Sequence, residues 1–279
     1  MNMNDVSRDA ARANGPFVPV ASGRLFSWRL SLEREGFAHT ALMDRYAAAA
    51  SRWRKITRVC GAEIAYAAAL KRIARSFDMP NGDAIRALDC GVGAGAMLKA
   101  LAGVFGPGAR LAGVDAAPEM IAEARAALSD AAIHADLRCA DVCQMPFPEE
   151  TFDICVSAHC LEHLSDPATG LREMARTAKP GGVIVAVLTP RTVIGALIHL
   201  KWRVRLASDP SADAMFAAAG LPTPQRFAVG GSWLNRALSV AYVARKPMLT
   251  LQIGAQASSS HAASGSSSRR QISALTRAW

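Results

Sequence analysis

The sequence has few aromatic residues and lacks a long apolar run. Only 6% of its 279 residues are Phe, Trp or Tyr. The strongest apolar run, from Val183 to Leu188, ends at Thr189-Pro190, whereas a membrane-spanning helix needs ~18 or more consecutive apolar residues. Residues 1–16 contain no apolar segment like that of a secretory signal peptide. We therefore predict a cytoplasmic protein without a membrane-spanning helix.

Cysteine is scarce as well, and no two cysteines have the Cys-x-x-Cys spacing of a zinc knuckle or a redox site. The six cysteines stand at positions 60, 90, 139, 143, 155 and 160. A reducing compartment keeps such residues as thiols, and a free cysteine in a strand behaves as a small buried hydrophobe. We predict unpaired, inert thiols and no metal site.

The net charge is +9, and residues 1–80 hold 13 basic and 7 acidic side chains. Most of the positive excess therefore precedes the central part of the chain. A positive surface can bind nucleic acid or anionic lipid, but a solvated helix face explains the same pattern. The charge alone does not choose between these classes.

The apolar fraction, 51%, suffices for one domain of about 150–200 residues with terminal extensions. We predict a flexible N-terminal arm over 1–37, a helical segment over 38–80, a main domain over 81–250 and a disordered Ser-rich tail over 251–279. In the helical segment, apolar residues recur three or four apart, which predicts two amphipathic helices broken near Gly61.

Short apolar runs alternate with helix-length stretches in the main domain. The pattern predicts strands over 86–90, 110–115, 133–139, 152–157, 183–189, 226–229 and 238–245, and helices over 94–104, 118–128 and 166–177. This rhythm is typical of a doubly wound α/β fold, a parallel sheet with helices on both faces. The alternation within 238–245 predicts an antiparallel partner for 226–229.

A glycine-rich loop follows the first strand of this domain. Gly91, Gly93 and Gly95 permit positive φ and let a ligand approach the backbone closely. With Ala96 the loop also satisfies the pattern of dinucleotide enzymes, so it does not choose the cofactor. Asp89 favours S-adenosylmethionine, which carries an ammonium and a sulfonium, because a carboxylate there would repel the pyrophosphate of NAD. A turn-capping role for Asp89 is the alternative.

Two further acids follow the next two strands. Asp115 lies 20 residues after Gly95, where a carboxylate can accept hydrogen bonds from a ribose diol. Asp141 is placed to accept from an adenine amino group while the backbone of Val142 reads the ring edge. The alternative for Asp141 is a surface loop acid.

These acids and the glycine loop are followed by MPFPEETFD, SAHCLEHLSD and AKPGGVIV. Over roughly residues 83–247 the succession resembles the class I S-adenosylmethionine-dependent methyltransferases, in the broad group that includes the quinone-biosynthesis C-methyltransferases. The resemblance implies a Rossmann-like, seven-stranded, mostly parallel sheet with an antiparallel last strand, an N-terminal helical lid, and S-adenosylmethionine as the cofactor.

The resemblance also implies which residues bind that cofactor. The methionine part falls to Asp89 and the Gly91–Gly95 loop, with Ser157 and Ala158 nearby, the ribose to Asp115 beside Ala116, and the adenine to Asp141 and Val142.

Methyl transfer depends mainly on holding donor and acceptor in line. If the acceptor is a hydroxyl or an acidic carbon, a base must take its proton, and His159 is the nearest candidate. A structural role for His159 is the alternative, and we expect His163 to be structural.

Four residues are candidates for a substrate lid: Tyr46, Trp53, Leu197 and Trp202. An aromatic stripe at helical spacing is also typical of core anchors. We expect a small-molecule acceptor that is apolar, such as a quinone, polyketide or lipid precursor, with the basic cluster at 201–205 touching an anionic headgroup or membrane surface. A core helix or a homodimer face is the preferred alternative for 193–205.

The sequence therefore predicts a methyltransferase acting on a small, apolar acceptor by in-line displacement. A nucleic-acid methyltransferase is disfavoured, because Ser157-Ala-His-Cys160 replaces an Asn/Asp-Pro-Pro-Tyr type of motif and brings no aromatic platform for a flipped base. A catalytically silent cofactor-binding scaffold stays open. An NAD-dependent oxidoreductase is disfavoured further, since no Tyr-x3-Lys pair follows.

Overall fold

The structure is a computed structural model that describes residues 17–25, 27–35, 39–80, 85–230 and 233–248. Within 17–53 many side chains fall outside this description, those of Tyr46 and Trp53 among them. The predicted Ser-rich tail over 251–279 lies wholly outside the described residues.

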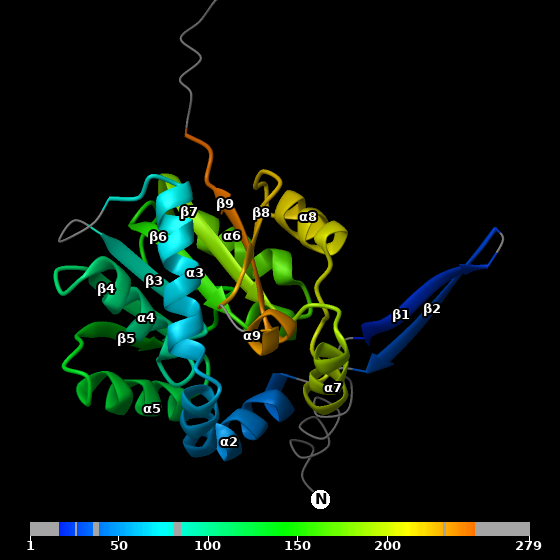
Figure 1. Ribbon diagram of the computed structural model, residues 1–279, viewed down its shortest axis with the longest axis horizontal. Helices are drawn as coiled ribbons and strands as arrows, with labels where there is room; N and C mark the ends of the chain where they lie inside the picture. The colour runs from blue at the N-terminus through cyan, green and yellow to red at the C-terminus, as the bar shows by residue number, and fades with distance from the viewer. Residues whose placement is uncertain (1–16, 26, 36–38, 81–84, 231–232, 249–279) are drawn as a thin grey trace, which may run out of the picture. The chain divides into compact units, whose positions relative to one another are not determined.

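A seven-stranded sheet forms the centre of the described chain (Figure 1), with the strand order β5-β4-β3-β6-β7-β9-β8. The strands are β3 (Arg86–Cys90), β4 (Arg110–Asp115), β5 (Ala135–Cys139), β6 (Phe152–Ala158), β7 (Ala178–Leu188), β8 (Gln225–Ala228) and β9 (Val240–Arg245). The first five run parallel, and β9 runs antiparallel to both β7 and β8. The predicted doubly wound, mostly parallel sheet with an antiparallel last strand is confirmed.

Helices cover both faces of this sheet, and alternate residues of β7 show why. Val183, Val185 and Val187 join one buried cluster, and Ile184 and Ala186 join the other. The first cluster includes residues of α3 (Ala62–Ser76), α4 (Ala96–Phe105) and α5 (Pro118–Ser129). The second includes residues of α6 (Pro167–Thr177) and α8 (Asp209–Ala218). A strand buried on both faces is apolar along its whole length, which is why this run was visible in the sequence.

The break predicted near Gly61 is confirmed. Helix α2 spans His39–Val59, α3 begins at Ala62, and Gly61 between them has φ +64°. No helix among the described residues is long and apolar enough to cross a membrane.

The N-terminal prediction was wrong for part of the arm. Within 1–37, β1 (Phe17–Leu25) and β2 (Trp28–Glu35) pair as an antiparallel hairpin. Trp28, Leu30 and Leu32 alternate with polar residues, a period of two that favours a strand.

Three smaller differences concern element boundaries. Strand β7 spans Ala178–Leu188 and so begins five residues before the predicted start at 183. A short helix, α9 (Trp233–Leu238), separates β8 from β9, so they are not joined by a tight turn. A brief 3-10 helix, η1 (Leu161–His163), follows β6.

Candidate functional site

The glycine loop lies at the carboxyl end of β3. Its three glycines have φ values of +88°, +49° and +82°. The amides of Gly91 and Val92 donate to the carbonyl oxygen of Val114 at 2.8 and 2.9 Å, which ties the loop to β4. A Cβ at Gly91 would overlap the side chain of Cys160. Glycine is therefore required at Gly91 both by its backbone conformation and by the close approach of the residues after β6.

Asp89, next to this loop, is fully buried, and neither of its oxygens has a hydrogen-bond partner among the described residues. Burial and then the nearby Asp115 carboxylate raise the pKa of Asp89 well above its ordinary value. A buried polar group without a partner costs free energy. The site therefore offers an acceptor that a donor or cation of a ligand would satisfy.

Asp115, at the end of β4, is held by the same loop. One oxygen accepts from the Gly93 amide at 2.9 Å and the other from the Ala117 amide at 3.0 Å. Burial raises the pKa of Asp115, and the amides of Ala117, Gly93 and Ala116 partly oppose this. The loop thus fixes the orientation of a carboxylate beside the position where a ligand would approach the glycines.

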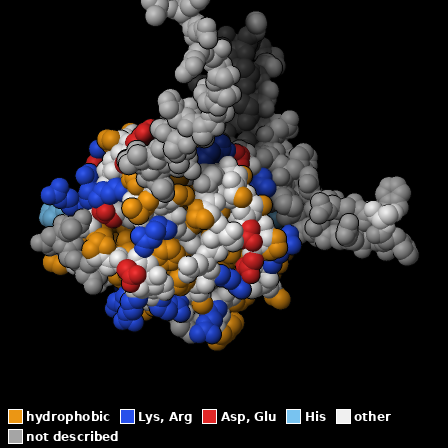
Figure 2. Space-filling model, turned by 90° about the horizontal axis from the view of Figure 1, so that it is seen from above, with side chains coloured by type: hydrophobic (Ala, Val, Ile, Leu, Met, Phe, Trp, Pro, Cys, Tyr) orange, Lys and Arg blue, Asp and Glu red, His pale blue; other side chains and the backbone are white. Residues whose placement is uncertain are grey.

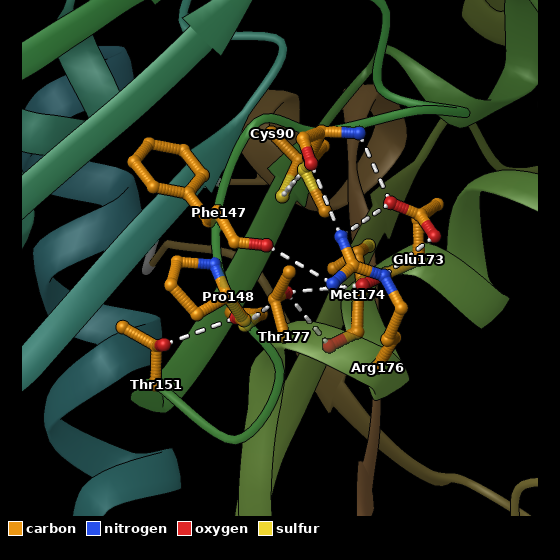
Figure 3. A network of polar contacts seen from close by, with 10 residues as sticks. Cys90, Phe147, Pro148, Thr151, Glu173, Met174, Arg176 and Thr177 are labelled. Atoms are coloured by element: carbon orange, nitrogen blue, oxygen red, sulfur yellow. Dashed lines mark hydrogen bonds and ion pairs between the residues drawn. The ribbon is translucent and has the colours of Figure 1, made fainter.

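The third acid, Asp141, is exposed and accepts from the Cys143 amide at 2.8 Å. Val142 beside it is buried. The loop that follows is fixed from α6, as Figure 3 shows for Glu173 and Arg176. Arg176 pairs with Glu173 at 2.8 Å and donates to the carbonyl oxygens of Met145 and Phe147, while Glu173 accepts from the Met145 amide.

The end of β6 supplies the fourth group of predicted residues. Ser157 is buried and its Oγ has no hydrogen-bond partner within the described part of the chain. Ala158 is half-buried, and His159 follows with φ +56°, a left-handed conformation unusual for a residue other than glycine. Such strain at a chain reversal is often kept for function.

His159 lies in a polar network. Its Nε2 is 2.8 Å from the Ser239 Oγ, and its Nδ1 is 3.2 Å from the Thr189 Oγ1 and 3.4 Å from the Glu162 Oε1. Glu162 also accepts from the Thr189 amide at 2.7 Å and from its hydroxyl at 2.8 Å. Residues from the ends of β6 and β7 and the start of β9 therefore hold the ring in one orientation.

Glu162 remains a carboxylate in this network. Burial raises its pKa, but the charge and hydrogen bond of His159, with His163 and the Thr189 amide, outweigh burial and place the pKa below its ordinary value. Burial lowers the pKa of His163, although Glu162 opposes this.

A cavity of about 440 Å³ opens beside His159. It is lined mostly by apolar residues of α2, α3, α7 (Val193–Trp202) and α9, with the polar network at one side. Its lining includes Ile56, Ala62, Ala65, Tyr66, His159, Glu162, His163, Thr189, Ile194, Leu197, Ile198, Trp202, Val229 and Ser239.

The structure brings most predicted residues to one edge of the sheet. Leu197 and Trp202 line the cavity, as does His163, which we had expected to be purely structural. The side chains of Tyr46 and Trp53 lie outside the described residues. Tyr66 is the aromatic residue on the N-terminal helices that is seen in the lining, and burial, followed by the charges of Asp89 and Glu162, raises its pKa.

The sequence analysis did not identify Tyr66, Thr189 and Ser239 as residues of the site. Tyr66 carried a weak signal, as the aromatic residue within an Ala-rich helix. Thr189 and Ser239 carried none, because their role depends on two strands that meet only in the folded sheet.

Residues 88–186 match the family model described as the methyltransferase domain. This part of the chain is a methyltransferase domain. Its glycine loop, Asp115, Asp141 and His159 all lie within the matched segment.

Two curated relatives illustrate the similarity of the methyltransferase domain. A ubiquinone biosynthesis O-methyltransferase of Rhodopseudomonas palustris is 31% identical over 142 residues, which cover 48% of this chain and 54% of that protein. A ubiquinone/menaquinone biosynthesis C-methyltransferase of Bdellovibrio bacteriovorus is 28% identical over 117 residues, covering 42% and 48%. The chain spans about half the length of the curated relatives it matches.

Two solved structures share the fold of the methyltransferase domain. A putative S-adenosyl-L-methionine-dependent methyltransferase of Methanococcus maripaludis superposes with a TM-score of 0.57 at 19% identity, covering 74% of this chain and 95% of that one. A geranyl diphosphate C-methyltransferase of Streptomyces coelicolor gives a TM-score of 0.52 at 15% identity, covering 64% and 79%. At these identities the likeness concerns the fold.

Proposed function

We propose that this chain is an S-adenosylmethionine-dependent methyltransferase that methylates a small apolar acceptor held in the cavity beside His159. The observation that carries the proposal is the buried Asp89 carboxyl, which has no hydrogen-bond donor among the described residues and lies next to three glycines with positive φ. A cationic ammonium group satisfies such a carboxyl, whereas a pyrophosphate would be repelled by it.

The remaining acids fit the other parts of the same cofactor. Asp115 presents an oriented carboxylate for the two ribose hydroxyls, with Ala116 beside it. Asp141 is an exposed acceptor for the adenine amino group, and the buried Val142 provides an apolar edge for the ring. Ser157, with its unsatisfied hydroxyl, and Ala158 lie at the strand end nearest the methionine part.

The cavity supports an apolar acceptor. Its volume lies within the range of about 300–1,000 Å³ that small-molecule sites occupy, and such sites combine an apolar lining with a few oriented polar groups. Two relatives are named for ubiquinone biosynthesis, which agrees with a lipophilic acceptor of the quinone-precursor type.

Positioning and a proton acceptor are what this chain contributes to the reaction. S-adenosylmethionine supplies a methyl group on a cationic sulfur, which keeps the bonding electron pair as the methyl carbon bonds to the acceptor. If the acceptor is a hydroxyl or an acidic carbon, His159 takes its proton, and the Glu162 carboxylate stabilises the resulting imidazolium. Orientation of the acceptor by the cavity provides the rest of the acceleration.

The cofactor test is isothermal titration of the purified chain with S-adenosylmethionine and, separately, with NAD. We expect binding of S-adenosylmethionine alone, lost in Asp115→Ala and retained in Asp213→Ala, an exposed acid on α8. Failure of the folded protein to bind S-adenosylmethionine would overturn the proposal.

The acceptor test follows a radioactive methyl group from S-adenosylmethionine into either organic-extractable phenols or oligonucleotides. We expect label in the phenolic pool. Label in the oligonucleotides would support a nucleic-acid methyltransferase instead, and binding without turnover of either pool would support a silent scaffold.

A further inference from the structure

Five exposed apolar side chains lie on or beside the helices that line the cavity. Val59 and Val193 are each 82% exposed, Ile64 is 78% exposed, Trp233 75% and Leu197 61%. Leu197 itself lines the cavity, and each of the others is one or two positions from a lining residue. These five side chains are called the cavity rim below. Most exposed apolar residues of soluble proteins occur singly, and a contiguous group marks an interaction site.

Helix α7 carries two of these exposed apolar residues. Ile194 and Ile198 face the cavity, and Val193 and Leu197 are exposed to solvent. The helix is therefore apolar on both sides, a pattern expected of a buried or membrane-contacting helix. A fully buried core helix does not fit this segment, because Val193 and Leu197 are exposed; the homodimer face stays a prediction.

The charge near the cavity rim is predominantly positive. Residues 44–63 hold five basic and two acidic side chains, Asp44 and Glu63, and residues 191–205 hold four basic and none acidic. Glu63 pairs with Lys99 at 3.2 Å. Lys55, Arg58 and Lys201 are exposed, and Lys201 also lines the cavity. Arg54 differs from these exposed residues, because its charge is paired with Glu123 and Asp130 of the main domain.

The opposite end of the molecule differs. Figure 2 looks onto the end of the molecule that is uppermost in Figure 1, where acidic, basic and apolar side chains are interspersed. Helix α3 begins with cavity-lining residues and ends with Lys71 and Arg75, which line a separate hollow with Asp78. An excess of positive charge therefore accompanies the exposed apolar residues at the cavity end.

We propose that the cavity rim docks on an anionic phospholipid bilayer. Apolar side chains of this kind, Trp among them, insert at the boundary between headgroups and acyl chains, and each nearby Lys or Arg adds attraction to an anionic leaflet. The docked orientation turns the cavity mouth toward the bilayer, from which a lipophilic acceptor enters without crossing water. That last consequence rests on the proposed function, whereas the docking itself does not.

Vesicle sedimentation with the full chain tests the docking. We expect binding to mixed phosphatidylcholine–phosphatidylglycerol vesicles, weaker binding to pure phosphatidylcholine vesicles, and a decrease as salt rises, because salt screens the headgroup charge. Val193→Asp should lower the partition coefficient about tenfold, while the control Met248→Asp, at an apolar residue that is 72% exposed and follows β9, should not.

The charge contribution is tested in parallel. The double variant Lys55→Glu/Arg58→Glu should reduce binding at least about tenfold, and the control Lys71→Glu/Arg75→Glu, on α3, should change it far less. Equal sedimentation of all variants, or none by the parent chain, overturns the docking. A light-scattering mass that falls from dimer to monomer in Val193→Asp would assign the cavity rim to a second copy instead. Titration with S-adenosylmethionine on the same samples keeps the two proposals separate, because loss of docking leaves cofactor binding intact.

Discussion

Burial of the Asp89 carboxyl lowers the stability of the folded protein, and a bound ligand that donates to it would offset this loss. Its carboxyl is fully buried without a donor among the described residues, and its pKa is raised. Because the folded protein holds the Asp89 proton more tightly than the unfolded chain does, this group lowers stability as pH rises above the ordinary carboxyl pKa. A functional site that is not optimised for stability is expected to behave in this way.

The variant Asp89→Asn removes this penalty. We expect its thermal midpoint at neutral pH to exceed that of the parent chain by about 2–4 °C, the shift that ~1 kcal/mol produces in a domain of this size. The gain in thermal midpoint should shrink toward zero as pH falls below the ordinary carboxyl pKa, because the side chain at position 89 is then uncharged in both proteins. Unfolding curves over a pH series check this, with Asp213→Asn as the exposed control. A lower midpoint at neutral pH would contradict the account.

The same carboxyl predicts a proton linked to cofactor binding. An ammonium group beside Asp89 favours the carboxylate, so binding should lower the pKa of Asp89 and release a proton. Affinity for S-adenosylmethionine should therefore rise with pH until Asp89 ionises in the free protein. Calorimetry in buffers of different ionisation enthalpy measures the release, which Asp89→Asn should abolish. Equal proton release in that variant would transfer the effect to another group.

Glu162 acts through His159. Its pKa is lowered, so it stays charged at neutral pH and can hold and stabilise the imidazolium. We expect Glu162→Gln to lower kcat by about 10²-fold, at the lower end of general base catalysis, with cofactor affinity unchanged. The loss should fall on kcat and leave the Kd for S-adenosylmethionine unchanged, a split that a general packing defect would not cause. Full activity in this variant would leave His159 a structural residue.

Residue chemistry was predictable from the sequence where it belongs to one local motif. Asp89 and Asp115 lie at the carboxyl ends of β3 and β4, and the glycines follow β3, at strand ends that the apolar pattern locates. The partners of His159 were not predictable, because Ser239 is 80 positions away in sequence and reaches the ring only through the sheet order. Motif reading therefore gave the candidate cofactor acids but not the network that orients the candidate base.

At the scale of elements, α6 fixes the loop that leads from Asp141. The Arg176 guanidinium spans the Glu173 carboxylate and two loop carbonyls (Figure 3), and the pair is partly shielded from solvent. Hydrogen bonds to charged groups contribute more than neutral ones, roughly 1.5–3 kcal/mol. The loop is thus held in place before any ligand arrives.

The variant Arg176→Gln tests this support. We expect the affinity for S-adenosylmethionine to fall about tenfold, since a loosened loop must be ordered on binding. Arg172→Gln is the matched control, one turn earlier on the same helix, where Arg172 pairs with the exposed Asp166. Titration calorimetry of both variants decides the question. Equal affinities would show that the loop after Asp141 holds its shape without α6.

The apolar periodicity of the sequence predicted some helices and strands well and others poorly. The buried parallel strands were predicted closely because both faces must be apolar. The hairpin over 17–35 was not predicted. Strand β2 alternates, but the alternating stretch is short and is surrounded by Gly, Pro and scattered charged residues, which are typical of irregular chain. Helix α7 was recognised as apolar, but periodicity does not say what covers a face, and the exposed Val193 and Leu197 had been assigned to a core or a dimer.

At the scale of the whole molecule, the two halves of the site are built from different parts of the chain. The candidate cofactor residues come from the ends of β3, β4, β5 and β6, within the methyltransferase domain match. The cavity is formed largely by α2, α3, α7 and α9, outside it. We therefore expect the sheet to supply the cofactor site and the added helices to determine which acceptor is admitted.

Because the cavity and the candidate cofactor residues come from different parts of the chain, we expect that a substitution in the cavity can weaken acceptor binding without weakening cofactor binding. Ala62, at the start of α3, lines the cavity. A phenyl ring there removes acceptor volume, so Ala62→Phe should raise KM for the acceptor at least about tenfold, as a misfit of a few methylenes does. Its Kd for S-adenosylmethionine should stay within about twofold. Steady-state kinetics and calorimetry on one preparation measure both. A parallel loss of cofactor affinity would mean that the helices and the sheet form one inseparable site, and the acceptor would then have to be sought nearer the glycine loop.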